Sequence, residues 1–358
     1  MNRQHRREKG DGTLLPERPE GCFAQKSPVP FFVGPLSRRE FLKAAAGAGA
    51  ALTLSGCLPS AVSDGGLSAA VAILRAGYDQ ALVNVIEAGF SLVPPPDVLN
   101  KRVLLKVNFV DLPRENKPIV TNPAAIVAAA EAFRRRGAAE VIVADGPALQ
   151  RDAWQIVDAV GLTPLLGERK LQFIDLNTAE PIRVPNALGQ VGLDHLYVAR
   201  PAWEADVVVS VPKMKVHHWL GVSLAMKNMF GVMSGVVYGA PRNVFHVRDP
   251  EAAVLDFNHT RPIDYAIVDG IVGLEGDGPV RGTAVDVGVL VMGSNALAVD
   301  ATAARVMCID PQRVGYLRRA AGDLGPITEA GIEQRGETIA SVRRPFAVLP
   351  HQASIQMS

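Results

Sequence analysis

The chain from Val207 to Arg248 carries many basic side chains and histidines and no acidic residue. These residues are Lys213, Lys215, Lys227, Arg242, Arg248, His217, His218 and His246. Charged residues ordinarily face solvent, but the first lysines here directly follow the apolar run Val207 to Val211. Unopposed positive charge beside a buried strand suits a phosphate, a carboxylate or another acidic ligand. We therefore interpret this stretch as an anion-binding site, with a solvated basic face as the alternative.

Three residues of this basic stretch are the candidates for catalysis. Lys213 and Lys215 share one face of an extended segment, because strand side chains alternate. His217 is the best acid–base candidate, since its ordinary pKa is close to neutrality and adjacent lysines depress it. His218 is interpreted as structural. A metal role for the two histidines is disfavoured, because the neighbouring lysines repel a cation.

Five further residues are predicted to contact the ligand. They are Lys106, Asn108, Lys227, Asn228 and His246. Lys227 and Asn228 are expected two turns into a helix over 220–230, whose free amino-terminal N–H groups favour an anion. Lys106 and Asn108 lie at the carboxyl end of a predicted strand over 103–110. There they are either exposed strand-end side chains or part of the same site.

Asp269, Asp277 and Asp300 are the candidates for a divalent metal site. The first two belong to a glycine-rich segment over 269–279 that is expected to form a loop after a strand. Its carboxylates suit a hard cation such as Mg²⁺, or they pair with the basic stretch, and its glycines allow it to act as a lid. It lacks the features of a P-loop or a dinucleotide fingerprint. Asp300 lies early in a predicted helix, where it also suits the helix dipole. Asp145 follows another strand and offers either a carboxylate or an Asp-Gly turn.

The elements that must position these residues alternate between β-branched runs and amphipathic segments. This alternation predicts an α/β fold: a single large Rossmann-like domain over 69–346 with a mostly parallel sheet covered by helices. Asn122 and Pro123 are expected to begin one of these helices as its N-cap and first residue. Ligands of such sheets bind beyond the carboxyl ends of the strands, which is where the candidate residues occur.

An export signal precedes the predicted domain. Ser37 is followed by the pair Arg38-Arg39 and a short apolar run over 44–54, the layout of a twin-arginine signal. The run is too short to span a bilayer as a helix, which takes about twenty residues. It ends at Leu54-Ser55-Gly56-Cys57, which resembles a bacterial lipobox with Cys57 as the acylated residue.

The signal implies the remaining boundaries and the location of the protein. Residues 1–36 form a disordered extension or precede the true start, 37–57 form the signal, 58–68 a linker and 347–358 a tail. The expected partners are the twin-arginine translocase, a membrane reached through the lipid anchor, and a small anionic ligand. The expected location is the periplasmic or exterior face of a membrane.

Composition limits the cofactors and partners. The formal net charge is +1 and aromatic residues are few, so we expect no nucleic-acid binding. With Cys22 before the signal and Cys57 as the lipid site, only Cys308 belongs to the domain. One cysteine cannot hold an iron–sulfur cluster, so none is expected from this chain. The cofactor stays unknown, with a divalent metal as the open alternative.

Several motifs together resemble the domain-of-unknown-function family DUF362. The most specific block runs from Val208 to Gly235 and includes Val-Pro-Lys-Met-Lys-Val-His-His and Met-Lys-Asn-Met-Phe-Gly. The other matching motifs are Lys106-Val107-Asn108, Thr121-Asn122-Pro123, Val268-Asp269-Gly270, Gly276-Asp277-Gly278-Pro279 and Ala298-Val299-Asp300-Ala301. The resemblance implies kinship and site positions but no reaction. Some relatives carry a ferredoxin-like four-cysteine segment, which this chain lacks.

Three functional hypotheses follow. The first is an enzyme acting on a small anion, with lysines holding the anion, His217 transferring protons, and Asp269 or Asp277 as partner carboxylate or metal ligand. The second is a non-catalytic lipoprotein that binds an anionic ligand or cofactor for a membrane complex. The third is a redox accessory that docks a partner carrying the metal.

Overall fold

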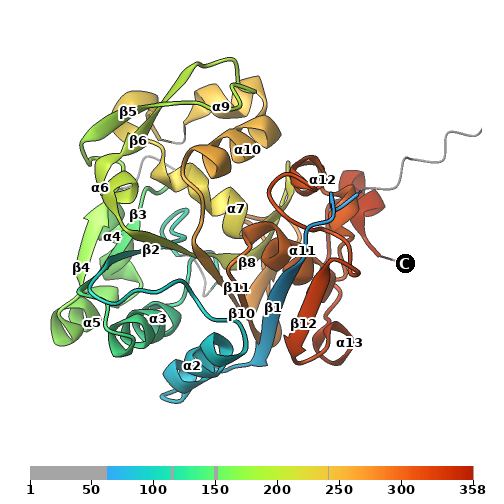
Figure 1. The fold of residues 1–358 in the computed structure, drawn as a ribbon, viewed down its shortest axis with the longest axis horizontal. Coiled ribbons are helices and arrows are strands. Elements are labelled where there is room, and N and C mark those ends of the chain that lie inside the picture. Colours follow the sequence, from blue (N-terminus) through green and yellow to red (C-terminus); the bar gives the residue numbers. More distant parts are fainter. Residues whose placement is uncertain (1–62, 114–116, 149–151, 241, 358) are drawn as a thin grey trace, which may run out of the picture. The chain divides into compact units, whose positions relative to one another are not determined.

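One central sheet of ten strands organises the part of the chain that the computed structural model describes, namely residues 63–357 apart from 114–116, 149–151 and 241 (Figure 1). The main path runs in the order β12-β1-β11-β10-β7-β2-β3-β4, and β8 and β9 extend it beside β10. The strands are β1 (Ala69–Arg75), β2 (Arg102–Val107), β3 (Glu140–Asp145), β4 (Gln172–Asp175), β7 (Val207–Val211), β8 (Lys213–His217), β9 (Gly221–Ser223), β10 (Tyr265–Glu275), β11 (Thr283–Gly293) and β12 (Ile332–Gly336). A separate antiparallel pair consists of β5 (Pro181–Pro185) and β6 (His195–Ala199).

The sheet is mostly parallel, as the sequence predicts. The strands β4, β3, β2, β7 and β10 run parallel to one another along the path. The exceptions are β11, which is antiparallel to both β10 and β1, and β9, which is antiparallel to β8. Residues of β2 and β7 are almost entirely buried, as expected for strands covered by helices on both faces.

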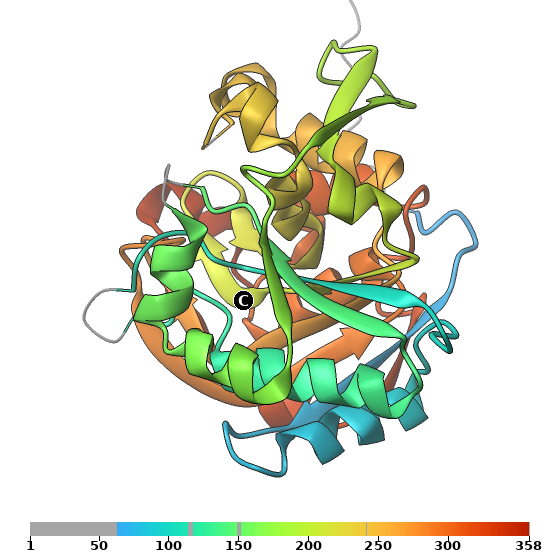
Figure 2. The same cartoon turned by 90° about the vertical axis from the view of Figure 1, so that its left-hand side faces the viewer.

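Helices cover both faces of this sheet. One face packs against α2 (Leu82–Leu92), α3 (Pro123–Arg135), α4 (Ala153–Ala159) and α5 (Leu162–Arg169). The opposite face packs against α6 (Arg200–Glu204), α7 (Ala225–Asn228), α10 (Pro250–Thr260), α11 (Ala296–Val306), α12 (Gly315–Ala320) and α13 (Ile339–Val342). Figures 1 and 2 both show α2 and α3 on the side of the sheet away from α10. The mixed α/β class and the helix-covered sheet are therefore confirmed.

Short helices complete the chain between and after these elements. They are α8 (Gly235–Tyr238), α9 (Asn243–Arg248) and the 3-10 helices η1 (Met229–Val232), η2 (Pro311–Arg313) and η3 (Pro350–Ile355). The predicted start of α3 is confirmed: the Asn122 side chain accepts the N–H of Ala124, and Pro123 is the first helical residue. Residues 347–357, predicted to be a tail, pack on the domain through the buried side chains of Gln352 and Ile355.

The predicted helix over 220–230 is wrong. The chain instead forms β9, the single turn α7 and then η1. Gly221 has a φ of +78°, which allows the tight turn that pairs β9 with β8. The apolar residues Leu220, Val222 and Leu224 repeat with period two, which is the period of a strand. Because the segment is almost entirely buried, it has no polar face that could distinguish a helix from a strand in the sequence.

The prediction that Asp269 lies in a loop is also wrong. Asp269 lies in the middle of β10, which continues to Glu275 and pairs with β11 along most of its length. A break in register between Gly270 and Val272 accommodates the glycines without ending the strand. Asp277 lies beyond the strand, so the two aspartates do not share a loop.

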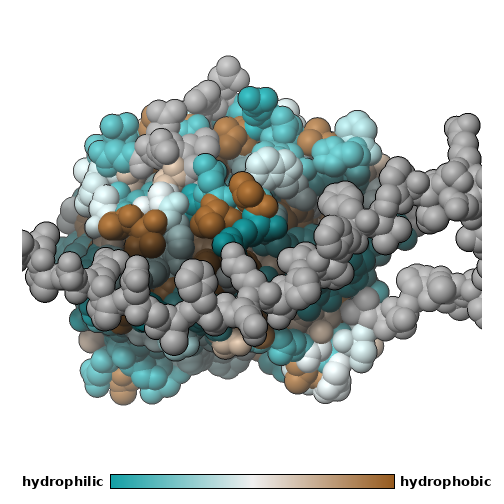
Figure 3. Space-filling model, turned by 90° about the horizontal axis from the view of Figure 1, so that it is seen from above, coloured by the Kyte–Doolittle hydropathy of each residue, from teal (hydrophilic) through white to brown (hydrophobic). Residues whose placement is uncertain are grey.

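The described region exposes several large hydrophobic side chains. Figure 3 shows hydrophobic residues in small groups among hydrophilic ones on one face. The most exposed large hydrophobic residues include Val247, Trp219 and Val236. No helix in the described part of the chain is long and apolar enough to cross a membrane. Arg38, Arg39 and Cys57 lie outside the described residues.

Candidate functional site

A cavity of about 550 Å³ lies where β2 and β3 end, as the position of the candidate residues predicts. Its walls include seven residues singled out from the sequence: Lys106, Asn108, Lys215, His217, Lys227, Asn228 and His246. Asp145 and Asp277 line the same cavity. Residues separated by more than a hundred positions in the chain thus meet at one site, and the volume is in the usual range for a small-molecule site.

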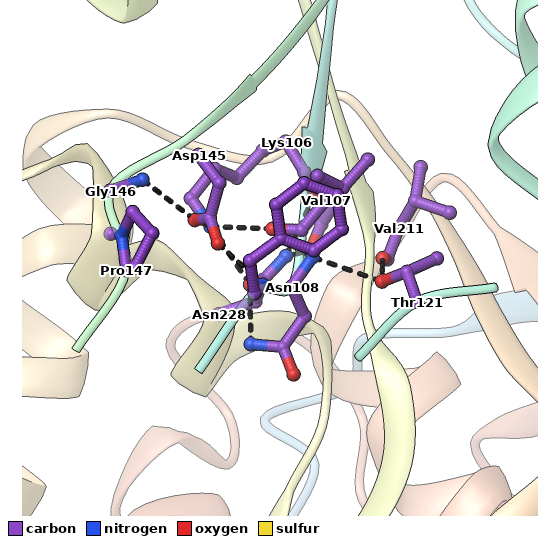
Figure 4. A network of polar contacts seen from close by, with 12 residues as sticks. Lys106, Val107, Asn108, Thr121, Asp145, Gly146, Pro147, Val211 and Asn228 are labelled. Atoms are coloured by element: carbon purple, nitrogen blue, oxygen red, sulfur yellow. Dashed lines mark hydrogen bonds and ion pairs between the residues drawn. The ribbon is translucent and has the colours of Figure 1, made fainter. Parts of the chain in front are cut away.

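Lys106 and Asp145 form a buried ion pair at the base of this cavity. They end adjacent parallel strands, and Lys106 Nζ lies 2.5 Å from Asp145 Oδ1 (Figure 4). The Asp145 carboxylate also accepts the N–H groups of Phe109 and Gly146. Burial lowers the pKa of Lys106, and Asp145 opposes this shift. Asp145, the last residue of β3, therefore supplies a buried carboxylate to the site.

Asn228 connects the ion pair to the neighbouring strands. Its Oδ1 accepts a hydrogen bond from Lys106 Nζ at 2.9 Å, and its Nδ2 donates to the carbonyl of Lys106 at 2.7 Å and to Ser210 Oγ at 3.1 Å. Asn108 donates to the same Asn228 Oδ1 at 3.3 Å (Figure 4). Asn228 is almost fully buried, so its role is to hold α7 against the end of β2.

Lys215 lines the cavity from β8 and is fully buried. Its Nζ donates to Asn108 Oδ1 and, at 2.8 Å, to the carbonyl of Ile119. These acceptors are neutral, and Lys215 forms no ion pair within the described residues. Burial, reinforced by Lys213 and other cations nearby, lowers the pKa of Lys215 to about 7.

Lys227 has no hydrogen-bond acceptor or carboxylate partner among the described residues. Its Nζ lies 3.6 Å from the centre of the Phe230 ring, a cation–π contact. Burial, followed by repulsion from Arg242 and Lys106, lowers the pKa of Lys227 to about 7. Lys227 is thus the lysine of this cavity whose hydrogen-bonding capacity the described residues leave unused; the exposed Arg281 at the cavity likewise has no side-chain partner among them.

Arg242 completes the cationic wall, although the sequence did not single it out beyond its place in the basic stretch. It is almost fully buried and donates to the carbonyl of Met233 at 2.7 Å and to Asn177 Oδ1 at 2.7 Å. Its φ of 64° is in the left-handed region, which is uncommon outside glycine and frequent at functional sites. Nothing in the sequence marks this backbone conformation. The absence of acidic residues around it is the signal that could have ranked it higher.

His217 is held in one tautomer by the backbone. Its Nδ1 accepts the N–H groups of Trp219 at 3.1 Å and Leu220 at 3.4 Å. A nitrogen that accepts hydrogen bonds carries no proton, so the neutral ring has its proton on Nε2. Burial, followed by Lys227, lowers the pKa of His217 well below its ordinary value. His217 is therefore neutral at pH 7 and acts as a hydrogen-bond donor.

His246 has the opposite tautomer. Its Nδ1 lies 3.3 Å from the carbonyl oxygen of Arg242, which can only accept, so the proton is on Nδ1 and Nε2 is an acceptor. Burial, followed by Lys227, lowers its pKa to about 4. Aromatic rings surround it, with Trp219 and Phe230 within 6 Å between ring centres. His217 and His246 thus give the cavity one neutral donor and one neutral acceptor, and His218 also lines it.

Lys213 and Asp269 lie outside the cavity walls. Lys213 Nζ is 2.6 Å from Asp269 Oδ2 and donates to Tyr78 Oη and to the carbonyl of Val272. Asp269 is fully buried and also accepts the Tyr78 hydroxyl at 2.7 Å and the N–H of Asn122 at 3.0 Å. These two predicted site residues therefore form a buried polar cluster that joins β8, β10 and the start of α3.

The three aspartates predicted as metal ligands lie apart. Asp300 is buried and accepts the N–H groups of Ala225 and Met226 at the start of α7, and burial raises its pKa to about 7. Asp277 lies at the cavity, with its Oδ1 3.6 Å from His218 Nδ1. Within the described residues, no group of three or more His, Cys, Asp or Glu side chains could hold a metal ion. Asp300 instead positions the turn that carries Lys227.

The fold places the chain among mixed α/β proteins with a large, mostly parallel sheet. Residues 103–305 match a family described as Domain of unknown function (DUF362), and the chain belongs to this family. Residues 35–55 match the TAT (twin-arginine translocation) pathway signal sequence. Both matches confirm what the motifs indicate: a DUF362 protein with a signal for export through the twin-arginine translocase.

Comparisons with individual proteins find one curated relative and solved structures that are similar over part of the chain. The chain is 29% identical over 220 residues to a thylakoid-associated protein of Synechocystis sp., covering 60% of this chain and 65% of that protein. Among solved structures, the lactate racemase apoprotein of Thermoanaerobacterium thermosaccharolyticum is similar over 62% of this chain and 55% of its own, with 11% identity and a TM-score of 0.37. A protein of Thermotoga maritima is similar over 55% of this chain and 50% of its own, with 12% identity and a TM-score of 0.28.

Proposed function

We propose that this exported protein binds a small organic anion in the cavity at the carboxyl ends of β2 and β3. The observation that carries the proposal is Lys227, a cavity-lining amine with no carboxylate or hydrogen-bond partner among the described residues. A group with three N–H donors needs acceptors when it leaves water. An anionic oxygen of a ligand would supply them.

The rest of the wall supports an anion over a cation or a neutral ligand. Lys106, Lys215 and Arg242 approach the same space, and of these only Lys106 has a carboxylate in direct contact. Positive charges gathered at low solvent exposure repel one another, and the bound anion would relieve this repulsion. Phe230 and Trp219 add apolar surface for the body of an organic ligand.

The experiment is a titration of the exported protein with paired ligands that differ only in charge. We expect organic phosphates and carboxylates to bind by calorimetry, the matching neutral amides or alcohols to bind at least about tenfold more weakly, and affinity to fall as salt rises. Equal affinity for a charged ligand and its neutral analogue would contradict the proposal. Turnover of a bound anion would distinguish an enzyme from a non-catalytic binding protein.

We also propose that an acyl group on Cys57 attaches the exported protein to a membrane. The Cys57→Ala variant is expected to move from the membrane fraction to the soluble fraction after export, because each buried CH₂ of the lipid contributes about 0.8 kcal/mol to membrane binding. Cell fractionation with detergent phase separation checks this. The matched control is Cys308→Ala, since Cys308 is a partly buried free thiol of the domain. Persistence of Cys57→Ala in the membrane fraction would contradict the anchor.

A further inference from the structure

Lys227 differs chemically from the other two lysines of the cavity and from Arg242. Lys106 is neutralised by Asp145, and Lys215 and Arg242 donate to fixed oxygen atoms of the chain. Lys227 has none of these partners within the described residues, and its Nζ lies over the Phe230 ring. Its amine therefore lines the cavity with its nitrogen free to react.

The surroundings of Lys227 favour the neutral, nucleophilic form of the amine. An amine attacks a carbonyl carbon only when its lone pair is free, and lysines that act in this way are desolvated or lie beside another cation. Both conditions hold here, because Lys227 is half-buried and its burial, together with Arg242 and Lys106, lowers its pKa to about 7. A large share of Lys227 is thus unprotonated near neutral pH.

Two histidines supply the proton donor and acceptor that condensation with a carbonyl group needs. His217 presents an N–H on Nε2, which can donate to the carbonyl oxygen of a ligand. His246 presents an unprotonated Nε2, which can accept the proton that the amine loses. Both rings line the cavity with Lys227. The remaining cations can hold the anionic group of the ligand.

We propose that Lys227 forms an imine with an organic anion that carries an aldehyde or ketone group. This inference rests on the proposed anion binding and names the class of ligand and the reacting atom. Nζ attacks the carbonyl carbon, a C–N bond forms, and the carbonyl π electrons move to oxygen, which takes up a proton. The nitrogen loses one proton to give the carbinolamine. A second proton then passes to the hydroxyl group, which leaves as water, and loss of the remaining N–H proton leaves a neutral C=N bond. One amine and one carbonyl give one imine and one water, and no oxidant or reductant is needed.

Borohydride trapping with two closely matched probes tests this proposal on the exported protein. Pyridoxal 5′-phosphate combines an anion, an aromatic ring and an aldehyde, and pyridoxine 5′-phosphate is the same anion with an alcohol in place of the aldehyde. We expect borohydride to fix one pyridoxyl group per chain, located at Lys227 by peptide mass mapping. Excess pyridoxine 5′-phosphate should suppress the labelling, because it occupies the cavity without reacting.

Variants separate covalent chemistry from anion binding. Lys227→Arg keeps the charge, so it should still bind pyridoxine 5′-phosphate within about tenfold of the wild type but lose the label. Lys170→Arg, at an exposed lysine, should keep both. Labelling at exposed lysines with Lys227 unmodified would overturn the proposal, as would absence of a label although pyridoxine 5′-phosphate binds. If neither phosphate nor any other organic anion binds, the proposed function itself fails and the imine with it.

Discussion

Replacing Asp269 by alanine is expected to lower the free energy of unfolding by about 3–5 kcal/mol, because it leaves buried Lys213 without its counter-ion. Asp269 is fully buried, and its carboxylate accepts the Tyr78 hydroxyl and the N–H of Asn122 in addition to the ion pair. Burial already lowers the pKa of Lys213, and Asp269 is the group that opposes this shift. Urea unfolding followed by circular dichroism measures the loss.

Two further variants test the origin of this effect. Asp277→Ala removes a carboxylate whose side chain is 39% exposed, so its stability should stay within about 0.5 kcal/mol of the wild type. The double variant Asp269→Leu with Lys213→Met removes both charges and should recover much of the lost stability. A loss of less than about 1 kcal/mol for Asp269→Ala, combined with loss of anion binding, would instead place Asp269 in the ligand site.

Replacing Lys227 by methionine is expected to weaken anion binding by about 10- to 100-fold while stabilising the protein. The loss of affinity corresponds to one charged hydrogen bond in a desolvated site. The gain in stability, on the order of 1 kcal/mol, follows from removing a partly buried ammonium that Arg242 and Lys106 repel. Calorimetry measures the affinity and urea unfolding the stability. Lys170→Met, at an exposed lysine, should change neither.

The stabilisation by Lys227→Met should depend on pH in a defined direction. The pKa of Lys227 is about 7 in the folded protein and 10.5 in its ordinary state. Between these values the unfolded chain binds more protons at this residue, so its contribution to wild-type stability rises with pH. The advantage of the variant should therefore be largest below pH 7 and vanish toward pH 10.5. A variant that is less stable than the wild type at pH 6 would show that Lys227 supports the fold.

Much of the site could be predicted because it depends on strand ends and local charge. Lys106 and Asp145 follow apolar runs that form adjacent parallel strands, and the carboxyl ends of such strands meet at one edge. His217, Lys215 and Lys227 could be predicted as site residues because the stretch that contains them has no acidic residue to pair with its positive charges. The local signals at Asn122 and Pro123 likewise placed the start of α3 correctly.

Other features could not be predicted, because distant segments decide them. The helix expected over 220–230 became β9 and α7 since β8 offers a pairing edge and Asp300 caps the turn from far along the chain. Asp269 was expected in a loop, but pairing with β11 keeps its segment extended. Its buried carboxylate contacts Tyr78 and Asn122, at the start of α3, beside Lys213. These contacts between distant segments make Asp269 and Lys213, two predicted site residues, a structural ion pair.

The sequence alone determined the export signal, the family, the α/β class and the position of a basic site after buried strands, because these depend on residue order and local periodicity. Only the tertiary structure decided which lysine is paired and which is free. Lys106, Lys213, Lys215 and Lys227 are the same residue type in similar apolar surroundings. Their chemistry diverges because Asp145 and Asp269 reach two of them, backbone and amide oxygens reach the third, and an aromatic ring faces the fourth.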